Sequence, residues 1–205
     1  MKIAGIYLAA GSSSRMGSNK LKLNVGTMTL GSLALETALK SSLDEIYIVT
    51  KETDDAVWLP PAMKLNNKCT IVPCPNAHEG QSESLKCGIR QAQAIHMDAV
   101  LIVLADQPFI TVQMLDEMIA CMKNNRTCSF VATTLEQTIM PPVLLSSSMY
   151  TELLSLRGDV GAKALLQGNF LQKGYVLPCA DQRLVFDVDT PEDYQTLLID
   201  KEKTK

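Results

Sequence analysis

The chain has 205 residues, of which 46% are hydrophobic and 20% are charged, and its formal net charge is −3. This length and composition are typical of one soluble globular domain with its own core. The negative net charge excludes a general electrostatic attraction to polyanions, so a phosphate site must be built locally. No apolar stretch approaches the ~20 residues that a membrane span requires. We therefore expect no nucleic-acid partner and no membrane.

Neither the cysteines nor the start of the chain suggests export. Six cysteines are scattered without a C-x-x-C pair, and His78 and His96 are not spaced with them as zinc ligands. The thiols are therefore expected to be reduced, mostly buried, and located in the cytoplasm. The first residues run directly into a motif and lack a cleavage region, which favours structure over a signal peptide.

Strand patterns alternate with helix patterns along the chain. Strands are expected at Ile3–Leu8, Glu45–Thr50, Cys69–Val72, Ala99–Leu104, Ser129–Thr133 and Val185–Val188. Helices are expected at Thr29–Lys40, at Gln81–Ala94, at Thr111–Met122, over most of Leu144–Gln167 with a break at Arg157-Gly158, and from Pro191 onward. Lys51–Asn67 shows no regular pattern and is expected to be an excursion or a lid.

The alternation predicts a single-domain α/β fold, Rossmann-like and doubly wound, with a mainly parallel sheet. We expect the domain to span residues 1–198, followed by a solvated tail at 199–205. Ligands of such sheets bind beyond the carboxyl ends of the strands, where the strand order reverses. The motifs that carry chemistry should therefore lie in loops at that edge.

The loop after the first expected strand reads A-A-G-S-S-S-R-M-G-S-N-K, from Ala9 to Lys20. Small residues allow backbone amides to approach an anion closely, and Arg15 and Lys20 add positive charge. The pattern indicates a triphosphate-binding loop, although it fits neither the Walker sequence nor G-x-G-x-x-G. The alternative interpretation is a Ser/Gly-rich connection without a ligand.

Two carboxylates stand at the ends of expected strands. Asp106 follows Ala99–Leu104 and precedes Pro108, so it lies at the ligand edge or caps the next helix. Asp189 precedes Thr190. Because Thr190 can itself cap the last helix, Asp189 is not needed as a cap and is available to bind a metal. Asp187 is expected on the same strand face as Asp189. Mg²⁺ needs one or two protein carboxylates besides phosphate oxygens and water.

Five segments, in order along the chain, resemble the nucleotidyltransferases that act on the molybdenum cofactor. They are L-A-A-G-S-S-S-R-M-G with Lys20, N-A-H-E-G-Q-S-E-S-L-K-C-G from Asn76, L-A-D-Q-P from Leu104, L-R-G-D-V-G-A-K from Leu156, and D-V-D-T-P from Asp187. Ala10 before Gly11 is similar to the cytidylyltransferase branch. The resemblance implies the nucleotide-diphospho-sugar transferase type of fold.

The resemblance also implies residue roles. Catalysis would rest on Arg15, Lys20 and Asp106, and Mg²⁺ would be bound by Asp106 and Asp189. The nucleotide would be bound by Leu8, Ala9, Ala10, Gly11, Ser12, Arg15, Lys20, Asn76, Gly80, Ser82, Ser84 and Asp106. The acceptor would be bound by Gln107, Pro142, Arg157, Asp159 and Lys163. Met140-Pro141 stands where the family has Gly-His before P-V-L, so the acceptor contact departs from the family pattern.

The implied activity is transfer of CMP from CTP to molybdopterin with release of pyrophosphate. The product would serve a molybdenum hydroxylase such as xanthine dehydrogenase, with transient contact to that enzyme or its insertion chaperone. One alternative is a transferase of the same fold that uses another nucleotide or acceptor. Another is a non-catalytic carrier of molybdopterin, which the pair Asp106 and Asp189 argues against because a carrier needs no metal.

Overall fold

The computed structural model describes residues 1–203, except for the side chains of residue 14 and residues 168–170. Its main sheet has seven strands in the order β5-β4-β1-β6-β8-β7-β9. The strands are β1 (Ile3–Leu8), β4 (Glu45–Lys51), β5 (Cys69–Cys74), β6 (Ala99–Leu104), β7 (Phe130–Leu135), β8 (Thr138–Ser146) and β9 (Gly174–Pro178). All pair in parallel except β8, which runs antiparallel to both β6 and β7. The expected α/β fold with a mainly parallel sheet is confirmed.

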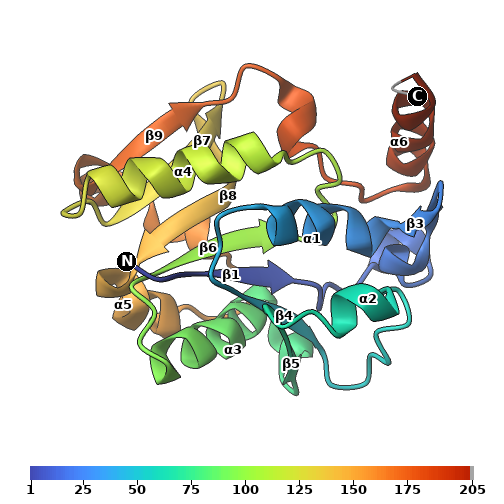
Figure 1. Ribbon diagram of the computed structural model, residues 1–205, viewed down its shortest axis with the longest axis horizontal. Coiled ribbons are helices and arrows are strands. Elements are labelled where there is room, and N and C mark those ends of the chain that lie inside the picture. Colours follow the sequence, from blue (N-terminus) through green and yellow to red (C-terminus); the bar gives the residue numbers. More distant parts are fainter. Residues whose placement is uncertain (204–205) are drawn as a thin grey trace.

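Helices cover both faces of the sheet (Figure 1). The helices α1 (Leu30–Lys40) and α4 (Val112–Asn124) pack on one face, and α3 (Gln81–Ala94) and α5 (Tyr150–Ser155) pack on the other. The central strands β1 and β6 are almost entirely buried, which explains their uninterrupted apolar sequences. None of the helices within residues 1–203 is long and apolar enough to cross a bilayer.

A third, smaller cluster lies beyond the ends of β1 and β6. The hairpin of β2 (Asn24–Val25) and β3 (Met28–Thr29), the start of α1, the loop before α6 and the helix α6 (Pro191–Lys203) pack together there, around the buried residues Val25, Leu30, Val188 and Leu197. In Figure 1, α6 stands at this end of the molecule, where the arrows of β1 and β6 point. The helix includes residues 199–203 of the expected tail, while residues 204 and 205 lie outside the described part. The boundary after residue 198 stays a prediction.

The segment 51–67 is anchored by one aromatic side chain. It contains the short helix α2 (Pro61–Lys64), and Trp58 is only 1% exposed beneath α1, with its ring centroid 6.5 Å from that of Tyr7. The backbone carbonyl of Trp58 also accepts a hydrogen bond from Thr29 Oγ1 at 2.6 Å. The segment between β4 and β5 is therefore part of the core packing around α1.

Two sequence-based expectations were wrong. Leu144, Leu145 and Ser146 belong to β8 rather than to a helix, and the helical part of the region consists of α5 and the 3₁₀ turns Ser147–Met149 and Ala162–Leu165. Val185–Val188 is not a strand, because a 3₁₀ turn at Gln182–Val185 precedes an extended loop. Val188 donates its backbone N–H to the carbonyl of Asp106 at 3.0 Å and buries its side chain against α6. Val188 is therefore apolar because it is buried, although it is not paired with any strand of the sheet.

Candidate functional site

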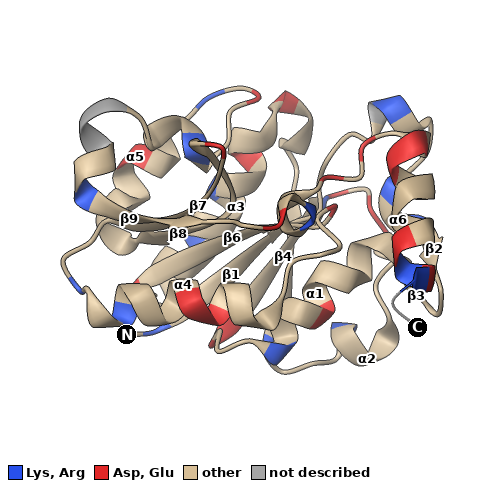
Figure 2. Cartoon of the chain, turned by 90° about the horizontal axis from the view of Figure 1, so that it is seen from above, with Lys and Arg blue, Asp and Glu red and all other residues tan. Residues whose placement is uncertain are grey.

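A cavity of about 790 Å³ opens at the carboxyl ends of β1, β4 and β6. β1 has β4 on one side and β6 on the other, so the strand order reverses at this point, as expected for the ligand site of a doubly wound sheet. In Figure 2, acidic stretches with basic ones among them gather between these strand ends and α6. The walls come from the loop after β1, residues 77–84, residues 140–143, residues 159–163 and the loop before α6.

The loop after β1 forms one wall through two tight turns. Ser13 and Gly17 adopt left-handed backbone conformations, with φ of 51° and 67°, on either side of the 3₁₀ turn Ser14–Met16. Asn19 then accepts a hydrogen bond from the backbone N–H of Leu21 at 3.1 Å, which caps a second turn that begins at Lys20. These turns place Arg15 and Lys20 on the same cavity.

Lys20 joins the two carboxylates that the sequence pointed to. Its Nζ lies 2.6 Å from Asp106 Oδ2 and 2.7 Å from Asp189 Oδ1, and its side chain is only 8% exposed. Burial acts to lower the pKa of Lys20, but Asp106 and Asp189 outweigh it and raise that pKa. The ammonium therefore remains charged and compensates two carboxylates at the cavity floor.

Arg15 reaches the same cluster from outside. Its guanidinium lies 2.8 Å from Asp189 Oδ2, while its side chain is 66% exposed. Burial acts to raise the pKa of Asp189, yet the hydrogen bonds from Lys20 and Arg15 hold that pKa below its usual value. Arg15 therefore contacts Asp189 and, because most of its side chain is exposed, can also contact a ligand in the cavity.

The two carboxylates fit a divalent cation that completes its coordination with ligand oxygens. Asp106 and Asp189 direct one oxygen each at a single atom, the Nζ of Lys20. Within residues 1–203, no cluster of three or more His, Cys, Asp or Glu side chains is arranged as a metal site. A cation here would thus have two protein carboxylates, and phosphate or water would supply the rest, which is the donor set that Mg²⁺ prefers.

Asp187 adds a third acidic group to the lining of the cavity. Burial, followed by the nearby charge of Asp106, raises the pKa of Asp187 to about 6. Its Oδ1 is buried without a hydrogen-bond partner among the described residues. Gln107, itself fully buried, donates from Nε2 to the Pro141 carbonyl at 3.4 Å and thereby links the Asp106 loop to the wall at residues 140–143.

The opposite wall is formed where the N-terminus of α3 meets the loop after α5. The backbone N–H of Ser82 donates to the Gly158 carbonyl at 3.2 Å, and that of Gln81 donates to Asp159 Oδ1 at 3.3 Å. Gly80 has a φ of 127°, and a Cβ there would lie 2.3 Å from the carbonyl carbon of Gly158. The close approach of these two loops therefore requires glycine at position 80.

Gly80→Ala is expected to lower the free energy of unfolding by about 2–4 kcal/mol, because backbone strain adds to the collision with Gly158. The matched control is Gly26→Ala, since Gly26 has a φ of 63° but no atom within 4 Å of the added methyl group. The control should lose about 1–2 kcal/mol from strain alone. Urea denaturation of both variants measures the difference, and equal losses would show that the two loops separate without cost.

Most of the residues singled out from the sequence line this cavity. They are Leu8, Ala10, Gly11, Ser12, Arg15, Lys20, Gly80, Ser84, Asp106, Asp159, Lys163 and Asp189. Six others do not: Ala9, Ser82, Gln107 and Pro142 are buried behind the walls, and Asn76 and Arg157 are exposed away from it. The roles of all these residues stay predictions.

Sequence reasoning did not assign a role to Lys51. It ends β4 and borders both the main cavity and an adjoining hollow of about 310 Å³ on the far side of the loop after β1. The sequence did contain a signal, because Lys51 is a basic residue directly after the expected strand Glu45–Thr50. In the structure this strand, β4, lies next to β1. Gln81 was also missed, although its side chain lines the cavity and packs against Gly161.

Comparison with known proteins places the chain among relatives of the same fold. Residues 5–174 match the family described as the MobA-like NTP transferase domain. The chain is 36% identical over 199 residues to the Bacillus subtilis (strain 168) protein named purine catabolism protein PucB, with 94% of each protein covered.

Solved structures agree over the full length. A Mycobacterium sp. strain JC1 homologue of Mycobacterium tuberculosis Rv0371c is 25% identical with a TM-score of 0.81 and 100% of both chains covered. A manganese complex of Rv0371c from M. tuberculosis H37Rv is 20% identical with a TM-score of 0.73, covering 97% of this chain and 99% of that one. A nucleotidyl transferase from Methanothermobacter (Mth528) is 19% identical with a TM-score of 0.79, covering 100% and 99%.

The family match extends over most of the chain and includes the loop after β1, the Asp106 segment and the wall at residues 77–84. The resemblance inferred from the five segments is therefore confirmed at the level of the family, and the protein is a nucleotidyltransferase by fold and family. The chain belongs to the MobA-like NTP transferase domain family.

Proposed function

We propose that the chain transfers CMP from CTP to the terminal phosphate of molybdopterin, with release of pyrophosphate. The observation that supports this proposal most directly is the convergence of Asp106 and Asp189 on one cation position, beside a loop that presents Arg15 and Lys20. This arrangement would accommodate both the anionic ligand and the metal that nucleotidyl transfer requires.

The chain's own residues would act mainly by alignment and charge. The acceptor is already an anion at neutral pH, so no general base or enzyme nucleophile is needed. The backbone of Ala10–Ser12 would hold the nucleotide, while Arg15 and Lys20 would stabilise the charge that develops on the departing pyrophosphate. Lys20 would exchange its carboxylate contacts for phosphate contacts when the nucleotide binds.

Asp106 and Asp189 would hold Mg²⁺, which when bound neutralises phosphate charge as a Lewis acid. The manganese complex of Rv0371c supports a divalent cation in this fold. Asp187 also lines the cavity, and even with its pKa raised by burial to about 6 it would carry a negative charge at neutral pH, close to the cation position.

On the acceptor side, Asp159 and Lys163 line the cavity together with Met140 and Pro141. Gln107 and Pro142 would act from behind the wall, because neither reaches the cavity surface. Arg157 is exposed and does not line the cavity, so it would have to move in order to contact an acceptor bound there.

The name of the Bacillus relative, a purine catabolism protein, supports a product that serves purine catabolism. The client would then be a molybdenum hydroxylase such as xanthine dehydrogenase, contacted transiently in the cytoplasm directly or through its insertion chaperone.

The decisive experiment supplies molybdenum-loaded molybdopterin with CTP, GTP, ATP or UTP, each with Mg²⁺ and with a chelator, and measures pyrophosphate and the dinucleotide product. Turnover with CTP that the chelator abolishes is the expected result. Turnover with GTP would keep the mechanism but reassign the nucleotide. Mg²⁺-dependent triphosphate binding without any turnover would overturn molybdopterin as the acceptor, and Met140-Pro141 would be the first segment to vary.

A further inference from the structure

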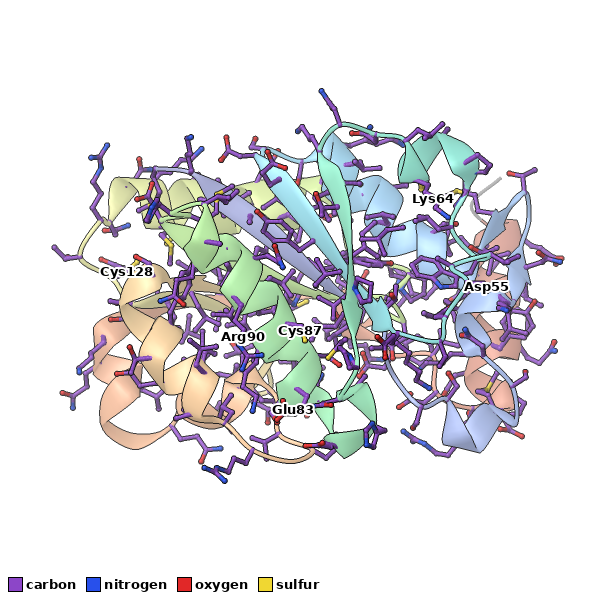
Figure 3. All side chains as sticks on the ribbon, turned by 90° about the horizontal axis from the view of Figure 1, so that it is seen from below. Asp55, Lys64, Glu83, Cys87, Arg90 and Cys128 are labelled. Atoms are coloured by element: carbon purple, nitrogen blue, oxygen red, sulfur yellow. The ribbon has the colours of Figure 1, made fainter. Side chains whose placement is uncertain are left out.

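Two thiols meet where the strand β5 passes beside the helix α3, outside the nucleotidyl-transfer cluster. Cys74 is the last residue of β5 and Cys87 lies in the second turn of α3. Their sulphur atoms are in hydrogen-bonding contact at 2.8 Å. Figure 3 shows Cys87 on the side of α3 that faces β5. A disulfide bond is about 2.05 Å long, so the two atoms would have to approach by only about 0.8 Å.

The two thiols differ in accessibility. Cys74 is only 1% exposed, whereas Cys87 is half-buried and can be reached from solvent. Burial, and then the contact with Cys87, raises the pKa of Cys74 to about 12. Cys74 therefore stays a thiol at neutral pH, and Cys87 is the member of the pair that a small oxidant meets first.

We propose that Cys74 and Cys87 are a modification site, at which peroxide forms a reversible intramolecular disulfide. Hydrogen peroxide oxidises the Cys87 thiol to a sulfenic acid and releases one water. The Cys74 sulphur then attacks the Cys87 sulphur, the S–S bond forms, and the hydroxyl leaves with the Cys74 proton as a second water. The two electrons pass to the peroxide, and a dithiol reductant reverses the reaction by thiol–disulfide exchange.

The disulfide would close the segment 75–86 into a loop. That segment includes residues 77–81 and Ser84, which form one wall of the main cavity. Cys74 also pairs with Lys51 in the register of β4 and β5, so the linkage joins α3 to the strand end that borders the cavity. Oxidation would therefore restrict this wall, whichever nucleotide or acceptor the cavity binds.

The test treats the full, reduced chain with stoichiometric hydrogen peroxide. Expected results are a mass loss of about 2 Da, a fall in titratable thiols from the six of the sequence by two, and a peptide pair joined through Cys74 and Cys87. The Tm should rise by about 5–10 °C, because the link restricts the unfolded chain. Amide exchange of residues 77–81 should slow by about tenfold, and dithiothreitol should reverse all of these changes.

Three variants make the result specific. Cys87→Ser and Cys87→Ala should both lose the mass change and the rise in Tm. Cys121→Ser, in which a half-buried cysteine on α4 is replaced, should keep them. Any of three results would overturn the proposal. Cys87 could accumulate as sulfinic acid without a link to Cys74, or the link could join other cysteines instead. The oxidised chain could also keep an unchanged Tm and unchanged amide exchange.

Discussion

Asp106→Ala is expected to lower turnover by a factor on the order of 10² or more while the fold survives, as for loss of an electrostatic stabiliser. Asp106 follows the buried strand β6 and contacts Lys20 at 2.6 Å, so its removal takes away half of the carboxylate pair that faces the proposed cation position. Pyrophosphate release at saturating nucleotide and Mg²⁺ measures the turnover. Circular dichroism and Tm report whether the fold is intact.

The matched control is Glu36→Ala, which removes a carboxylate that pairs with Lys40 on the exposed face of α1. It should keep normal turnover because an exposed i,i+4 pair contributes little and lies away from the cavity. Asp106→Asn keeps the size of the side chain and should still lose activity. Ordinary turnover in Asp106→Ala at saturating Mg²⁺ would remove Asp106 from the mechanism.

Lys20→Ala is expected to weaken triphosphate binding by about ten- to a hundredfold, since a charge-assisted contact is worth about 1.5–3 kcal/mol. The effect on stability should be smaller, although Lys20 pairs with two carboxylates. The side chains of Asp106 and Asp189 are 23% and 32% exposed, so water can hydrate both when the ammonium is absent. Titration calorimetry with CTP and thermal unfolding of the free protein measure the two effects separately.

Lys22→Ala provides the comparison for Lys20→Ala. Lys22 lies in the same 3₁₀ turn, but its side chain is 47% exposed and pairs with Asp55, outside the cavity. Its loss should change neither CTP affinity nor Tm to a notable extent. A large fall in Tm for Lys20→Ala together with unchanged CTP affinity would make Lys20 a structural residue.

Local patterns predicted the regular elements well where one pattern dominated. The apolar run Ala99–Leu104 and the helical spacing of Gln81–Ala94 have the predicted bounds, because both faces of β6 and one face of α3 are buried by the fold. Thr111 caps α4 through a hydrogen bond from Met114 N at 3.1 Å, as its residue type suggested. These features depend on neighbours within a few residues.

The incorrect predictions of secondary structure arose where the pattern of apolar residues does not reveal how the backbone is paired. Leu144 and Leu145 are apolar because both lie in the antiparallel strand β8, and the spacing of a few residues did not separate a strand from a helix there. β9 was missed because it is a short edge strand whose Tyr175 and Val176 are exposed, so it lacks the alternation of a half-buried strand.

Motifs and periodicities that are local in the chain were enough to predict the family, the fold class and twelve of the residues that line the cavity. The tertiary structure alone decided that Lys20 lies between Asp106 and Asp189, residues 86 and 169 positions away. It likewise decided that Gln107 and Ser82 are buried behind the walls and that Cys74 meets Cys87. Such contacts depend on strand order and helix packing, which bring together side chains whose spacing along the chain carries no signal.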